Sequence, residues 1–161
     1  MPIPPLTEKD AIKIASKHYE LTAEAKNLPG DADRNFLLST KNEKFILKIQ
    51  ALDTKQENIE FQHAALQHLS GFVGTPRVIP NKDGEMLFKI SHKGDHYLAR
   101  MVSFLEGTLL EEIVPKSPNL LRGLGAYIAK LDLALADFSH SAMREEDSPW
   151  DLSLAHLGIE P

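Results

Sequence analysis

The stretch RNFLLSTKNEKFILKI, residues 34–49, contains two apolar runs on either side of a short polar segment. This pattern predicts two β-strands joined as a hairpin. The second run carries a lysine, Lys48, between Leu47 and Ile49. Burying an ammonium group without a partner is costly, so Lys48 either lies at the surface of the strand or is kept for a purpose. The function of the chain depends on which of these holds.

Composition narrows the class of protein. The chain has 161 residues, a net charge of −5 and no cysteine. The acidic balance argues against a nucleic-acid partner, which would require a basic surface, and the absence of cysteine excludes disulfides and thiolate metal sites. No apolar run approaches the roughly 20 residues of a membrane span, and the N-terminal segment lacks the pattern of a signal peptide. We therefore expect a soluble, cytoplasmic protein without a membrane partner.

Local signals predict an α+β fold. Thr7 with Asp10 resembles a capping box at the start of a helix over 7–18. Ser117 followed by Pro118 caps a long helix. The other predicted elements are strands at 20–28, 75–79, 85–91 and 96–105 and a helix at 54–70. Because most links between the strands are short, the sheet should be antiparallel.

Lys48 has candidate partners in the helix that follows its strand. Glu57 and Glu60 lie one turn apart on one face of that helix. In protein kinases, a strand lysine held by a carboxylate from the next helix orients the nucleotide phosphates. The segment 28–35 falls between two strands, where a phosphate-covering loop belongs, although Gly30 is its only glycine. On these residues alone, a nucleotide site and an ordinary surface lysine are both open.

The order of the elements resembles the N-terminal lobe of the aminoglycoside phosphotransferase-like small-molecule kinases, and several segments are similar to the hydroxylysine kinase branch of that family. The segments are RNFLL, FILKI, NIEFQHAALQHL, YLARMVSFLEG, LGAYIAKLDLALADF and WDL, and the likeness runs over residues 6–157. It implies a protein-kinase-like lobe, with an antiparallel sheet of about five strands and one inserted helix. Residues 1–104 would form this nucleotide-binding lobe, and residues 105–161 the hinge, linker and start of a helical lobe.

The resemblance also implies roles for individual residues. Lys48 would contact the phosphates, with Glu60 as its helix partner. Ser103 C=O and Leu105 N–H would face the adenine edge, with Val102 behind it. The remaining implied binding residues are Phe104 in the hinge and the turn above the phosphates, Asp31, Ala32, Asp33, Arg34 and Asn35. Leu28, Leu47 and Ile49 are candidates for the apolar walls of the site.

One departure from the family limits the expected activity. The family's catalytic loop combines His, Gly and Asp with a following Asn, and a later Asp binds the metal. The sequence contains no HGD tripeptide and stops at Pro161. We therefore expect no catalytic residue and no metal ligand in this chain. The resemblance implies ATP or GTP with Mg²⁺ as cofactors, the metal being held by a missing C-terminal lobe. A longer parent would move the γ-phosphate to a hydroxyl of an amino acid or amino alcohol such as hydroxylysine.

Two other interpretations stay open. The chain could be a non-catalytic kinase-like regulatory or ligand-binding module, for example the N-terminal domain of a class III aminotransferase fusion. It could also be a plain interaction domain in which Lys48 faces solvent.

Arg100 alternates with apolar residues in its strand and is expected to pair with a nearby acid. His92 and His96 flank a turn, but no carboxylate cluster completes a metal site there.

Overall fold

A computed structural model of the protein describes residues 3–143, and the WDL motif at 150–152 lies outside them. The elements are α1 (Glu8–Tyr19), β1 (Glu24–Leu28), β2 (Arg34–Ser39), β3 (Lys44–Ile49), α2 (Gln56–His68), β4 (Val78–Ile79), β5 (Phe88–His92), β6 (Asp95–Ser103), the 3-10 helix η1 (Leu110–Glu112) and α3 (Pro118–Leu135). The strands form one antiparallel sheet in the order β1-β2-β3-β6-β4, with β5 also paired to β6.

The predicted α+β architecture is confirmed, and each of the six strands predicted along the chain has a counterpart, where the family resemblance implied about five. The hairpin of residues 34–49 forms the centre of the sheet as β2 and β3. The strand predicted at 75–79 is reduced to β4, whose two residues pair with the last part of β6, while β5 pairs with the first part of the same edge. β3 and β6 therefore have neighbours on both sides, and they carry the residues discussed below.

The main core lies on one face of the sheet, against α1. Successive strand residues point to opposite faces, and on this face the side chains from β2, β3 and β6 are fully buried. They are Phe36, Leu38, Leu47, Ile49, Ala99 and Met101. Ala11 and Ala15 on α1 are also fully buried, and their small size lets the helix approach the sheet closely. This packing fixes the register of the three strands, since a one-residue slip would turn every core side chain to the other face.

The helix ends follow the sequence signals. The Thr7 side chain accepts a hydrogen bond from the Asp10 amide, and the Asp10 carboxylate accepts one from the Thr7 amide at 2.9 Å. The Ser117 hydroxyl accepts a bond from Leu120 N–H, with Pro118 in the first helical turn. Both caps satisfy backbone groups that a helix end leaves unpaired.

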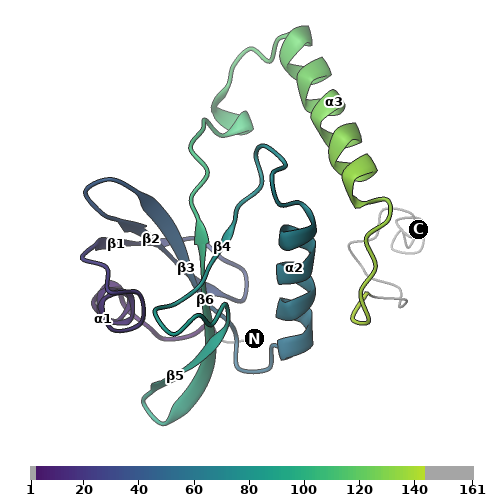
Figure 1. The fold of residues 1–161 in the computed structure, drawn as a ribbon. Helices are drawn as coiled ribbons and strands as arrows, with labels where there is room; N and C mark the ends of the chain where they lie inside the picture. The colour runs from purple at the N-terminus through teal and green to yellow at the C-terminus, as the bar shows by residue number, and fades with distance from the viewer. Residues whose placement is uncertain (1–2, 144–161) are drawn as a thin grey trace, which may run out of the picture.

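α2 lies on the opposite face of the sheet from α1 (Figure 1). Ile59 and His63, one turn apart, are its buried residues. Its outer side packs against the segment that follows α3, where the Phe61 ring lies 5.7 Å from the Phe138 ring and 5.6 Å from the His140 ring. α2 therefore has a sheet side and a side covered by later chain. Among the described residues, no helix is long and apolar enough to cross a membrane.

We expect the burial of His63 to make the fold sensitive to acid. Desolvation lowers the pKa of His63 to about 4; Arg100 also lowers it and Glu60 opposes the shift. The unfolded side chain has a pKa of about 6.5, so between pH 6.5 and 4 the unfolded chain takes up a proton that the folded chain does not. We expect the free energy of unfolding to fall over this window, by on the order of 3 kcal/mol at pH 4.

Urea unfolding between pH 4 and 7 measures this effect. The His63→Gln variant should show a flatter pH dependence than the unaltered chain, whereas the matched change at an exposed histidine, His96→Gln, should not. An unaltered slope in His63→Gln would show that the acid sensitivity arises elsewhere.

Candidate functional site

Three polar residues form a row across the face of the sheet that α2 covers. Asn35 on β2 lies directly opposite Lys48 on β3, and Lys48 lies opposite Arg100 on β6. Residues directly opposite one another in an antiparallel pair share a face. Because Leu47 and Ile49 belong to the core on the α1 side, Lys48 must point the other way, toward α2. A lysine can therefore stand between two buried apolar residues of β3, because its side chain lies on the other face of the sheet, between Asn35 and Arg100.

Lys48 is held by two side chains that precede it in the sequence. Its Nζ donates a hydrogen bond to Asn35 Oδ1 at 3.0 Å and lies 3.7 Å from Asp33 Oδ2. The side chains of Lys48 and Asp33 are each 25% exposed. Burial lowers the pKa of the Lys48 ammonium; Asp33 opposes this shift and Arg100 adds to it. Lys48 is thus a half-buried cation with one charged neighbour of the same sign, Arg100, and one of opposite sign, Asp33.

The loop before β2 is drawn closely onto the row. Asn35 Nδ2 donates to the Pro29 carbonyl at 3.3 Å, so one amide side chain connects the loop to Lys48. A Cβ atom at Gly30 would lie 2.5 Å from the Asp33 carbonyl oxygen and 2.6 Å from Asn35 Nδ2. The single glycine of the loop is therefore needed for close approach rather than for flexibility over the whole segment.

Arg100 is the third member of the row and was not predicted to belong to the site. It is 4% exposed, and its Nη2 donates to the side-chain oxygen of Gln62 on α2. Burial lowers the pKa of the Arg100 guanidinium, while Asp33 raises it. The expected nearby acid is Asp33, which acts on Arg100 through its charge, while the hydrogen bond described for Arg100 goes to an amide. The register of β3 and β6 brings Arg100 beside Lys48, and no local sequence signal reports that register.

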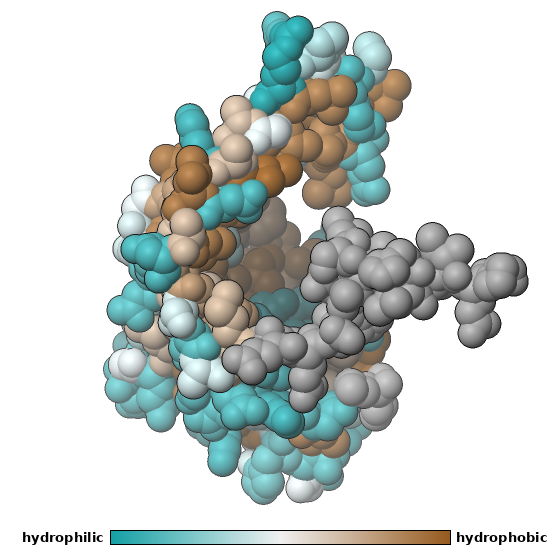
Figure 2. Space-filling view, turned by 90° about the vertical axis from the view of Figure 1, so that its right-hand side faces the viewer, coloured by the Kyte–Doolittle hydropathy of each residue, from teal (hydrophilic) through white to brown (hydrophobic). Residues whose placement is uncertain are grey.

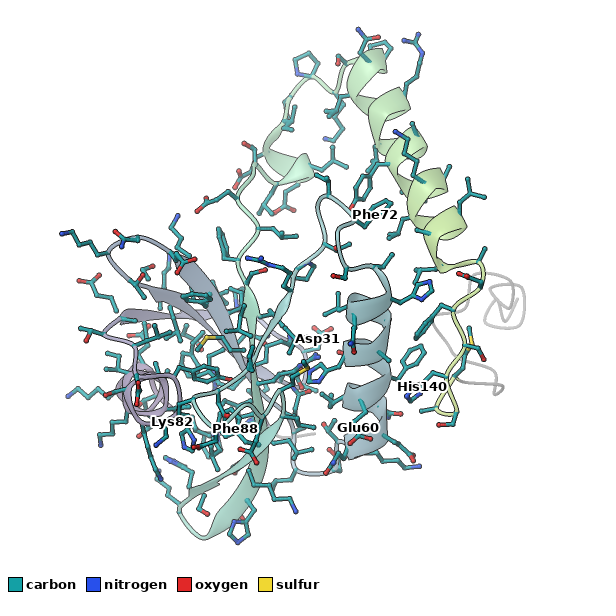
Figure 3. The ribbon with its side chains drawn as sticks, in the orientation of Figure 1. Asp31, Glu60, Phe72, Lys82, Phe88 and His140 are labelled. Carbon is teal, nitrogen blue, oxygen red and sulfur yellow. The ribbon has the colours of Figure 1, made fainter. Side chains whose placement is uncertain are left out.

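The predicted ion pair between Lys48 and Glu60 is wrong. Glu60 is exposed and accepts a hydrogen bond from Gln56 Nε2 at 2.8 Å. Helix geometry explains the difference, because successive side chains are about 100° apart while residues three or four apart share a face. Gln62 and His63 lie three and four residues after buried Ile59, whereas Glu60 lies one residue after it. Glu60 therefore sits on an outward-facing part of α2 (Figure 3).

An apolar surface continues from the polar row on the same face. Leu37, Ile46 and Val102 lie opposite one another on β2, β3 and β6, two residues along each strand from the row. They, rather than Leu47 and Ile49, are placed to wall a ligand near Lys48, because Leu47 and Ile49 are buried in the α1 core. Leu28 lies opposite Asn35 on β1 and is partly buried, so it remains a candidate.

The predicted hinge begins at Ser103, the last residue of β6, at the end of this apolar surface. Ser103 N–H donates to the Arg77 carbonyl and Ser103 Oγ accepts from Arg77 N–H, both at 2.9 Å, which ties the hinge to β4. Phe104 N–H donates to the Lys44 carbonyl at 3.2 Å. Leu105 is 47% exposed, and its N–H has no backbone partner among the described residues. Leu105 N–H is thus a hinge donor that could bond a ligand.

The structure brings together part of the predicted turn. Asp33 and Asn35 meet at Lys48, and Asp31 lies exposed at the loop surface. Arg34 points to the other side, where its Nε donates to the Pro4 carbonyl and its Nη1 to Asn27 Oδ1, each at 3.0 Å. Its side chain therefore anchors the N-terminal segment and is directed away from Lys48.

This arrangement can neutralise an anion next to an apolar surface and a free backbone donor. A half-buried lysine fixed by an amide suits phosphate oxygens, and the apolar surface suits a planar base. Within residues 3–143, no group of three or more His, Asp or Glu side chains gathers in a way that could hold a metal ion.

The fold is that of a kinase-like N-terminal lobe, and comparison with known proteins identifies the family. Residues 24–157 match the phosphotransferase enzyme family (APH), and the chain belongs to that family. It is 31% identical over 134 residues to a homoserine kinase of Agrobacterium fabrum (strain C58). The aligned region covers 83% of this chain and 37% of that protein. The chain thus spans little more than a third of the curated relative.

Solved structures confirm the fold. The microcompartment-associated aminopropanol kinase aligns with a TM-score of 0.67 at 20% identity, over 91% of this chain and 46% of that one. The amicoumacin kinase hAmiN, solved with AMP-PNP, Ca²⁺ and Ami, aligns with a TM-score of 0.70 at 17% identity, over 97% of this chain and 48% of that one. The described residues thus form an antiparallel sheet with helices, as in the N-terminal lobe of a protein-kinase-like fold.

The close approach at Gly30 yields a stability prediction. We expect Gly30→Ala to lower the free energy of unfolding by about 1–3 kcal/mol, because the new methyl group meets a backbone oxygen that cannot move independently of the loop. Thermal and urea unfolding measure the change. Gly107→Ala is the matched control, since a Cβ there meets nothing within 4 Å. Equal stability of the two variants would contradict the tight loop.

Proposed function

We propose that this chain is the nucleotide-binding part of a phosphotransferase that moves the γ-phosphate of ATP or GTP to a hydroxyl group of an amino acid or amino alcohol. The observation that carries this proposal is the fixed position of Lys48, tethered by Asn35 and directed to the face that also holds Leu37, Ile46 and Val102. Membership of the phosphotransferase enzyme family supports it.

The binding mode follows from the chemistry of each part. Lys48 neutralises phosphate oxygens, and backbone amides of residues 31–35 act as donors above them. The purine base lies against Ile46 and Val102, and its edge meets the hinge at Ser103–Leu105, where Leu105 N–H is the available donor. Backbone groups read this edge, so ATP and GTP are both candidates. Residues 1–104 then form the nucleotide lobe.

The acceptor class rests on the relatives. One relative is named a homoserine kinase and one structural neighbour an aminopropanol kinase. The names share a small amine that carries a hydroxyl group, which is the chemistry we propose for the acceptor here. Hydroxylysine belongs to the same class and is retained as one member of it.

The catalytic base and the Mg²⁺ ligands are proposed to come from a C-terminal helical lobe that residues 105–161 begin. The chain spans 37% of the homoserine kinase and 46% and 48% of the two structural neighbours, which supports a longer parent protein. So do the apolar residues at helical spacing on α3, where Leu121 is 50%, Leu124 37% and Ile128 48% exposed. Figure 2 shows apolar surface gathered in the upper part of the molecule, the part that holds α3.

Nucleotide binding by the chain tests the role of Lys48. Calorimetric titration with ATP and with GTP in the presence of Mg²⁺ should show binding, and Lys48→Ala should weaken it about 10- to 100-fold, the usual effect of losing a charged hydrogen bond. The control Lys41→Ala removes an exposed lysine in the turn between β2 and β3 and should leave the affinity unchanged. Equal affinities of the two variants would contradict the proposed role.

Phosphoryl transfer is then tested in a polypeptide that extends into the helical lobe. Release of nucleoside diphosphate is followed across hydroxylated amino acids and amino alcohols, including homoserine, aminopropanol and hydroxylysine. Acceptor-dependent release that Lys48→Ala abolishes would establish the kinase and its substrate class. Nucleotide binding without release for any acceptor would instead favour the non-catalytic kinase-like module.

A further inference from the structure

The two partners of Lys48 differ in how firmly they are placed. Asn35 belongs to β2, is 9% exposed, and bonds both Lys48 Nζ at 3.0 Å and the Pro29 carbonyl at 3.3 Å. Asp33 belongs to the bend before that strand and reaches Lys48 only at 3.7 Å. Asn35 is therefore a fixed tether, whereas Asp33 makes a longer and partly exposed contact that can be exchanged without breaking the sheet.

Among the residues that the structure describes, the charges around the row do not balance. Lys48 and Arg100 contribute two cations, and Asp33 contributes one carboxylate. The groups that hydrogen-bond to the two cations, on Asn35 and Gln62, are neutral amides. Glu60, which could have balanced the second charge, lies on the exposed side of α2 and bonds Gln56. Partly buried charges are stabilised by counter-charges, so the row has room for more negative charge than Asp33 supplies.

A polyphosphate and the Asp33 carboxylate cannot share Lys48 without cost. Both are anions, and like charges held within a few ångströms in a partly desolvated site repel strongly. The polyphosphate carries several negative charges and can neutralise Lys48 and offset the positive charge of Arg100. Asp33 carries one charge and sits on a bend, so it is the anion that can leave.

We propose that Asp33 takes the place of a nucleotide phosphate at Lys48 and leaves Lys48 when the polyphosphate binds, while Asn35 holds the lysine in position. This inference rests on the proposed function for the identity of the ligand, and it goes further in naming the group that the ligand displaces. Asp33 then acts as an internal competitor. It keeps Lys48 charged and ordered when no nucleotide is present, and it lowers the affinity for every ligand that carries a phosphate at this position.

The effect is specific to charge at the phosphate position. Asp33→Asn keeps the size and shape of the side chain and removes only its charge, so it should tighten binding of ATP and of inorganic tripolyphosphate by about threefold to tenfold. Adenosine has no phosphate, and its affinity should not change. Asp83→Asn, the same substitution at an exposed turn on the α1 side of the molecule, should leave all three affinities unaltered.

Calorimetric titration of the 161-residue chain with these three ligands, at fixed ionic strength and with Mg²⁺ present, makes the test. Thermal unfolding of each variant first confirms that it is folded. Tighter ATP and tripolyphosphate binding in Asp33→Asn, with adenosine unchanged, supports the exchange. Unchanged or weaker ATP binding in Asp33→Asn, in a chain whose ATP binding depends on Lys48, overturns it while leaving the proposed function intact.

The remaining outcomes separate the two proposals. If tripolyphosphate binds with the expected dependence on Asp33 and Lys48 but neither ATP nor GTP binds, the exchange holds and the nucleotide function fails. If neither tripolyphosphate nor nucleotide binds to the unaltered chain or to Asp33→Asn, both proposals are overturned, and the pair of Lys48 and Asp33 is a structural contact only.

Discussion

The half-burial of the Lys48 ammonium is the constraint on which the site depends. A cation on the covered face of a sheet needs partners, because desolvation penalises its charged form. The partners are Asn35, aligned with it by strand register, and Asp33, brought to it by a loop that closes on Gly30. The register itself is fixed on the other face, where the apolar core against α1 leaves no room for a slip. The same three strands thus carry the core on one face and the site on the other, so core packing determines the geometry of the site.

Much of the fold could be predicted because its signals are local. The hairpin of residues 34–49, the capping box at Thr7 and the start of α3 at Ser117 and Pro118 each depend on a few neighbouring residues, and the structure has all three. Family membership could be predicted as well, because motif order along the chain survives where identity is low. β4 is the weakest element, since its two residues form a strand only by pairing with the end of β6.

The details of the site could not be predicted, because they depend on placement between distant elements. Arg100 reaches Lys48 through the pairing of β3 and β6, and that register is settled by core packing over the whole sheet. Gln62 replaces Glu60 on the inner side of α2 because of the rotation of the helix about its axis, which buried Ile59 and His63 determine. The alternation of side chains along β3, by contrast, already places Ile46 and Leu47 on opposite faces of the sheet. This alternation could have identified Ile46, rather than Leu47, as the residue that lines the site.

A crystal structure of the chain with AMP-PNP and Mg²⁺ would show directly which groups contact Lys48. We expect a phosphate oxygen within hydrogen-bond distance of Lys48 Nζ, the bond from Lys48 to Asn35 retained, and the base against Ile46 and Val102. A nucleotide bound elsewhere on the molecule, with Lys48 still paired to Asp33, would contradict this expectation.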